Sequence, residues 1–146
     1  MLFYHNPQLH NTKDMPTTTA TLTLNTSEFS GGGTLTKTST LTKAGTATGI
    51  DQFTGVSRVY KAAATDDISV VAASAYTDAK AHKVYIKNTS DTDVTSYLLV
   101  EMASNVILGR LYPGDWLFLP TDGTTDIKVS TSAANMYYEF AVFHEG

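Results

Sequence analysis

The stretch Lys83-Val84-Tyr85-Ile86-Lys87 decides the fold class of this chain, because its side chains alternate with a period of two residues. Such alternation is typical of a β-strand with one face in the core and the other toward water. Val84 and Ile86 share one face and are predicted to be core residues. The polar stretch Asn88-Thr89-Ser90-Asp91 follows directly and predicts a turn.

Strand patterns continue from this stretch to the C-terminus. Further strands are predicted at residues 97–102, 105–111, 116–119, 127–129 and 136–143, with the 116–119 strand ending at Pro120. Ala103-Ser104 predicts a tight hairpin, and Pro113-Gly114 fits a type II turn, which needs a pre-set φ followed by a positive φ. The core and the turns are assigned to Val84, Ile86, Leu111, Pro113, Gly114, Trp116, Phe118 and Phe140.

The first half of the chain is rich in threonine, a β-branched residue that suits a pleated, half-wet strand. The runs at 21–24, 34–36 and 40–42 each place leucine on one face and threonine on the other. Gly31-Gly32-Gly33 predicts a loop between the first two runs, and residues 44–61 are expected to form an extended loop. Because these runs carry few bulky apolar side chains, we expect another surface, such as a second subunit, to cover them.

The pattern as a whole predicts an all-β fold, a β-sandwich or a small jelly-roll-like barrel, with an extended N-terminal arm. Residues 1–30 are assigned to the arm or extension and residues 31–146 to the body, with the densest core at 81–146. Residues 1–15 show neither the period of two residues of a strand nor the period of 3.6 residues of a helix. The first fourteen of them are interpreted either as an upstream extension or as an ordered arm that reaches a neighbour.

Aromatic side chains occur on both faces of the 136–143 strand, which indicates that both faces are at least partly covered. A core plus a subunit interface explains this better than a stacking platform for sugars or single-stranded nucleic acid. The interface or arm contacts are assigned to Phe3, Tyr4, Leu22, Leu24, Tyr137 and Phe143.

Composition argues against several kinds of partner. The 146 residues carry a net charge of −4 and no cysteine, and only 16% of them are charged. An acidic chain with scattered basic residues is a poor ligand for nucleic acid, and no apolar run approaches the roughly 18 residues of a membrane span. Without cysteine there is neither a disulfide nor a thiolate metal site. The N-terminus lacks the pattern of an export signal.

No enzymatic motif is present either. There is no Gly-x-Ser-x-Gly sequence and no cysteine nucleophile. His82 and His144 are isolated in sequence, and the polar residues at 88–93 lack the glycine and the distant glutamate of a calcium loop. Glu101 and Glu139 are interpreted as outward-facing residues of otherwise apolar strands. We therefore expect a non-enzymatic protein with no catalytic residue, no cofactor and no metal.

Four segments carry a resemblance to a known class of proteins. They read KVYIKNT at 83–89, LGRLYPGDW at 108–116, TDIKV at 125–129 and YEFAVFH at 138–144. In this order they resemble small virion proteins of tailed bacteriophages. The threonine-rich runs also fit such proteins, so the resemblance extends over residues 16–146.

The resemblance implies a particle subunit, first of all a capsid cement or decoration protein on the head surface of a phage. Its implied partners are the major capsid protein or other virion proteins, together with further copies of itself, a trimer being favoured. The alternative is a tail, baseplate or fibre subunit, including one with a carbohydrate-binding tip. A host-side, lectin-like binding domain is a third class.

Overall fold

The computed structural model describes residues 18–25, 33–41, 50, 52–73, 75–76, 82–91, 93–103 and 105–145. These residues form eleven β-strands and no helix, which confirms the predicted all-β class. Within the same residues there is accordingly no helix with the length and apolar character needed to cross a membrane.

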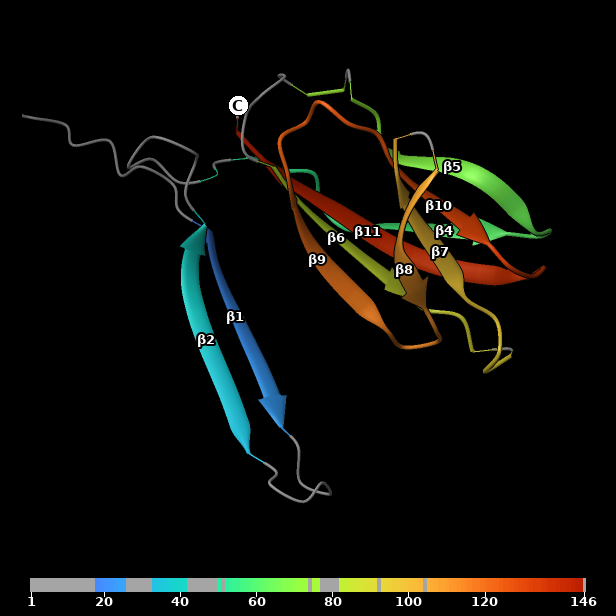
Figure 1. The fold of residues 1–146 in the computed structure, drawn as a ribbon, viewed down its shortest axis with the longest axis horizontal. Coiled ribbons are helices and arrows are strands. Elements are labelled where there is room, and N and C mark those ends of the chain that lie inside the picture. Colours follow the sequence, from blue (N-terminus) through green and yellow to red (C-terminus); the bar gives the residue numbers. More distant parts are fainter. Residues whose placement is uncertain are drawn as a thin grey trace, which may run out of the picture.

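Two larger antiparallel sheets form the body of the molecule (Figure 1). The four-stranded sheet has the order β5 (Thr65–Val71), β10 (Ile127–Thr131), β7 (Leu98–Met102) and β8 (Val106–Leu111). The five-stranded sheet has the order β3 (Gln52–Phe53), β11 (Met136–His144), β6 (His82–Asn88) and β9 (Trp116–Thr121), and β4 (Ser57–Lys61) also pairs with β11.

The hydrophobic core lies between these two sheets. The four-stranded sheet contributes Val70, Val71, Leu98, Val100, Leu111, Ile127 and Val129, and the five-stranded sheet contributes Val84, Ile86, Met136, Tyr138 and Val142. Two separate sheets that share one apolar layer make a β-sandwich, so the sandwich alternative is correct and the barrel is not. Most buried apolar residues lie after residue 81, as expected, and Ile50, Val70 and Val71 add to them from before that position.

The alternation along β6 is borne out residue by residue. Val84 and Ile86 are 0% exposed, whereas Lys83, Tyr85 and Lys87 between and beside them are only partly buried. β6 pairs with β11 on one side and with β9 on the other, which places it in the middle of its sheet. The strand that decided the fold class is therefore an internal strand with one face in the core.

Asn88 at the end of β6 joins the two sheets. Its side-chain Nδ2 donates a hydrogen bond of 2.9 Å to the carbonyl oxygen of Leu111, the last residue of β8 in the opposite sheet. Its backbone carbonyl accepts a bond of 2.9 Å from the N–H of Gly114. Gly114 has φ +90°, and the N–H of Asp115 donates to the carbonyl of Tyr112 at 2.9 Å, as in the predicted type II turn.

Three details of the sequence interpretation are wrong. The region 44–61 is not all loop, because Ser57–Lys61 forms β4, which pairs with the edge of β11 opposite β6. The 116–119 strand does not end at Pro120 but runs through it to Thr121. Proline lacks the N–H of a ladder, and β9 tolerates it as an edge strand.

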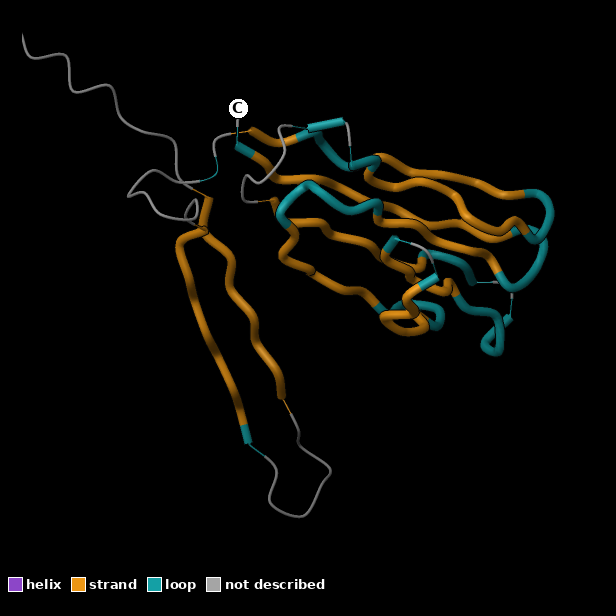
Figure 2. Tube along the Cα trace, turned by 45° about the horizontal axis from the view of Figure 1, so that its top comes forward, coloured by secondary structure: helices purple, strands orange, loops and turns teal. Residues whose placement is uncertain are grey.

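The third error concerns the threonine-rich runs at 34–36 and 40–42. β1 (Thr18–Asn25) and β2 (Thr34–Leu41) pair with each other along their whole length, and β2 is one strand rather than two. β1 and β2 together form one hairpin, which we treat as a unit. Figures 1 and 2 show this hairpin projecting from one end of the sandwich. The rest of the predicted arm lies outside the described residues.

Replacing Asn88 by alanine is expected to lower the free energy of unfolding by about 2 kcal/mol, because the buried carbonyl of Leu111 loses its partner. Asp91→Ala, three residues further on and exposed, is the matched control and should change stability by less than about 0.5 kcal/mol. Urea unfolding measures both. Equal stability of the Asn88→Ala variant and the wild type would remove this cross-sheet bond from the account.

Candidate functional site

The outer face of the five-stranded sheet is lined with aromatic side chains. Residues opposite one another in a sheet share a face, so Tyr85 of β6 lies on the same side as its partner Phe118 of β9. The same pairing rule places seven aromatic residues on this outer side: Phe53, Tyr60, Tyr85, Trp116, Phe118, Tyr137 and Phe143. We call this set the aromatic face.

The rings of the aromatic face contact one another in cross-strand pairs. Phe53 stacks on Phe143 with ring centroids 4.6 Å apart, and Tyr60 lies 4.7 Å from Tyr137. Much of this surface still faces water, since Phe53 is 54% exposed, Trp116 50% and Tyr60 48%. A patch of several half-exposed aromatic residues is typical of a binding surface, whereas single exposed apolar residues are common on any protein.

The charged groups of this face surround the rings. Arg58, Lys83 and Lys87 lie on the outer side, together with Glu139. The hydroxyl of Tyr85 donates a hydrogen bond of 2.9 Å to Oε1 of Glu139. Burial raises the pKa of Tyr85 to about 12, and the hydrogen bond and the negative charge of Glu139 act in the same direction. Tyr85 is thus held neutral and fixed at the centre of the face.

The β1–β2 hairpin has two chemically distinct sides. Its register puts Leu22, Leu24 and Leu35 on one side, which we call the leucine face, and these side chains are 37%, 46% and 45% exposed. The other side carries threonines in register, of which Thr21 and Thr38 lie within hydrogen-bonding distance at 2.9 Å. Threonine pairs support the hairpin from one side, while the leucine face has little cover.

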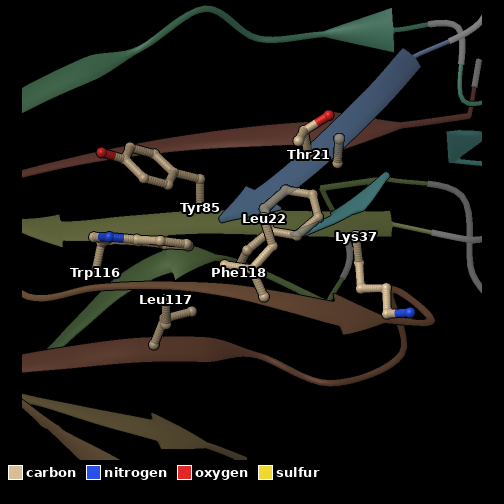
Figure 3. Close-up of a pocket in the computed structure, with 8 residues that line it drawn as sticks. Thr21, Leu22, Lys37, Tyr85, Trp116, Leu117 and Phe118 are labelled. Carbon is tan, nitrogen blue, oxygen red and sulfur yellow. The ribbon is translucent and has the colours of Figure 1, made fainter. Parts of the chain in front are cut away.

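A pocket of about 580 Å³ separates the hairpin from the sheet (Figure 3). Ala20, Leu22 and Lys37 line it from the hairpin, and Tyr85, Trp116 and Phe118 line it from the aromatic face. The hairpin therefore approaches the β9 side of the face with an open apolar space in between.

A third apolar surface lies on the other sheet. β8 is an edge strand of the four-stranded sheet, and its residues Val106, Ile107 and Leu108 are 58%, 61% and 42% exposed. We call these three residues the β8 edge. Among the described residues no strand pairs with its outer side. An apolar, unpaired edge is a template for a further strand.

The residues named from the sequence divide into three groups. Val84, Ile86 and Leu111 are buried, Phe140 packs against the core, and Pro113 and Gly114 form the turn, all as predicted. Trp116 and Phe118 are not core residues, since the register of β9 directs Leu117 and Leu119 inward instead. Of the proposed contacts, Leu22, Leu24 and Tyr137 are exposed and Phe143 is half-buried, whereas Phe3 and Tyr4 lie outside the described residues.

The expectation of an extended loop at 44–61 leaves out Phe53 and Tyr60, which lie on β3 and β4. The alternation of Arg58, Val59 and Tyr60 is the signal that identifies β4, with Val59 packed against the core. Exposure of the β8 edge leaves no such signal, because a fully apolar run is the same in sequence whether it is covered or not.

His82 and His144 lie opposite each other on β6 and β11 with ring centroids 6.3 Å apart, whereas the two glutamates considered as a catalytic pair lie apart. Glu101 accepts a hydrogen bond of 3.2 Å from Ser130 on the four-stranded sheet, while Glu139 lies on the outer side of the other sheet, so they form no carboxylate pair. Asp93 accepts from the backbone N–H of Thr95 at 2.8 Å, as a turn residue does. The described part of the chain holds no group of three or more His, Asp or Glu residues suited to a metal ion.

The tyrosine at the centre of the aromatic face predicts a pH dependence. Because the pKa of Tyr85 is about 12 in the folded chain and 10 in the ordinary case, the folded state holds the proton more tightly. The free energy of unfolding should therefore fall as the pH rises from 10 to about 12. Urea midpoints across this window measure the slope. The Tyr85→Phe variant should show a smaller slope of stability against pH. The Tyr112→Phe variant, at an exposed tyrosine, is the control and should keep the slope of the wild type. Equal slopes in all three proteins would contradict the raised pKa of Tyr85.

Comparison with protein-family models, with curated proteins and with solved structures finds no match to this chain. The functional argument therefore rests on the three apolar surfaces described above.

Proposed function

We propose that this chain is a structural subunit of a tailed-bacteriophage particle, of the capsid cement or decoration type. In this proposal the β8 edge contacts the capsid, and the aromatic face and the hairpin contact further copies. The single observation that carries it is the presence of three exposed apolar surfaces on one small chain. A protein that bridges subunits needs contacts on more than one side.

The distribution of the surfaces supports bridging. The aromatic face and the β8 edge belong to different sheets, and the hairpin projects from the sandwich (Figure 1). Each hairpin strand has eight residues, a span of about 26 Å at the usual rise of a strand. An arm of this length reaches beyond the body to a neighbouring subunit.

The β8 edge suits a protein partner of a particular kind. An edge strand binds by adding an extended segment to its sheet, so that backbone hydrogen bonds supply affinity and side chains supply specificity. Monomeric proteins usually protect such edges with charges, prolines or bulges. Val106-Ile107-Leu108 carries no charge and no proline, although its pairing with β7 has a register shift at Leu108. The three apolar side chains favour an edge that is covered in the assembled state.

The second candidate function is a tail or fibre subunit that binds carbohydrate. The exposed rings of Phe53, Tyr60 and Trp116 favour it, because flat aromatic rings combine an apolar surface with polar tips. Trp116 is the only tryptophan of the chain, so its fluorescence reports directly on a ligand at this face. A saccharide that changes this fluorescence, with copies found only at the tail, would favour this candidate over cement.

The number and place of the copies test the main proposal. In particles of the phage that encodes this chain, we expect many copies spread over the head and none confined to the tail. Quantitative mass spectrometry gives the copy number, and electron microscopy with a labelled chain gives the location. A few copies at the tail, or no copies in the particle, would contradict the cement assignment.

Charge at the β8 edge should prevent attachment. Ile107→Asp places an unpaired carboxylate in the contact, so particle occupancy should fall by a factor of about 10 or more. Val94→Asp is the matched control, because Val94 is an exposed valine in the loop before β7. Occupancy is measured by sedimentation with particles that lack the chain. Equal occupancy of the two variants would remove the β8 edge from the proposal.

A further inference from the structure

We infer that the leucine face of one copy packs on the aromatic face of a second copy. The hairpins of neighbouring copies are thereby exchanged, and each copy both donates a hairpin and receives one. This inference rests on the proposed function, in which these two surfaces make contacts between copies.

The first step is that the hairpin needs a cover. Among the strands that the structure describes, β1 and β2 pair only with each other, and none of the sandwich strands extends their sheet. A two-stranded hairpin is at best marginally stable in water and becomes stable by packing its apolar side. Leu22, Leu24 and Leu35 supply that side and are largely exposed.

The second step is that the hairpin's own body does not provide the cover. Leu22 is the one leucine of the leucine face that lines the pocket of about 580 Å³ next to the aromatic face, together with Ala20, Thr21 and Lys37. Leu24 and Leu35, nearer the tip of the hairpin, are not among the residues that line this pocket. Phe53 and Tyr60 lie on β3 and β4, at the edge of the sheet opposite β9, and also remain exposed.

The third step is the match between the two surfaces. Strand β1, which carries Leu22 and Leu24, is eight residues long, and β6 and β11 at the centre of the aromatic face have seven and nine residues. Covering the exposed halves of Phe53, Tyr60 and Trp116 removes roughly 300 Å² from water. A specific interface buries about 800 Å² per partner, so these three rings supply more than a third of it before the other residues are included.

The fourth step selects a second copy as the partner. Both surfaces occur on every copy, so each contact leaves one hairpin and one aromatic face open for the next copy. A contact between two different surfaces of the same chain closes into a ring when the rotation allows it. Exchange thus covers every leucine face and every aromatic face without a further protein.

Cross-linking tests the exchange, because the chain has no cysteine of its own. Leu24→Cys and Tyr60→Cys are made as two separate single variants with different tags, mixed, and treated with a short bis-maleimide. The exchange predicts a covalent dimer that carries both tags. The matched control replaces Leu24→Cys by Thr23→Cys, on the threonine side of the same strand, and should give much less product.

A double variant with both cysteines on one chain separates the alternatives. Cross-linking within single chains, with no mixed dimer from the two single variants, would show that the hairpin closes on its own body and would overturn the inference. The absence of any cross-link would overturn it as well. Both residues are exposed, so the variants should fold as the wild type does.

Self-association gives a second measurement. Leu24→Asp should weaken it by a factor of about 10 or more in sedimentation equilibrium, and Thr23→Asp should leave it nearly unchanged. Failure of the exchange and failure of the proposed function are distinguishable here. If the chain binds particles but shows no exchange of hairpins, the cement proposal stands and the exchange is wrong. If the chain exchanges hairpins but never binds particles, the exchange stands and the cement proposal is wrong.

Discussion

The alternation of side chains along β6 is the constraint on which the rest of the structure depends. β6 lies between β11 and β9, so its register fixes which residues of all three strands enter the core. A slip of one residue would place Lys83, Tyr85 and Lys87 inside and expel Val84 and Ile86. The same register also fixes the aromatic face, because the residues next to each inward-facing residue of these strands face outward.

The sequence predicts this strand well and its neighbours unevenly. Strict alternation identifies β6. Pro113-Gly114 identifies the turn whose Gly114 donates a hydrogen bond to Asn88 at the end of β6. β4 was missed because it offers a single core residue, Val59, among polar neighbours. Trp116 was misplaced for a different reason: its size suggests burial, but burial depends on the register with Lys87, which sequence does not reveal.

The candidate surfaces consist of the large apolar side chains that are not buried in the core. Apart from Val56, Val94 and Tyr112 in loops, the exposed large apolar side chains of the described residues lie on the aromatic face, on the leucine face of the hairpin and along the β8 edge. Sequence reasoning placed Leu22, Leu24 and Tyr137 among the contacts because a thin or two-sided strand requires a second cover. It could not find the β8 edge, since exposure there depends on the order of strands in the sheet. The threonine side of the hairpin lets an arm with few bulky residues stay extended.

The central claim is that the hairpin is ordered by contacts between chains. Hydrogen exchange of its backbone amides tests this most directly, in a sample diluted until sedimentation shows single copies and again in the assembled state. We predict that amides of β1 and β2 exchange much faster than those of β6 in single copies and become protected on assembly. Hairpin amides as protected as those of β6 in a single copy would contradict the account.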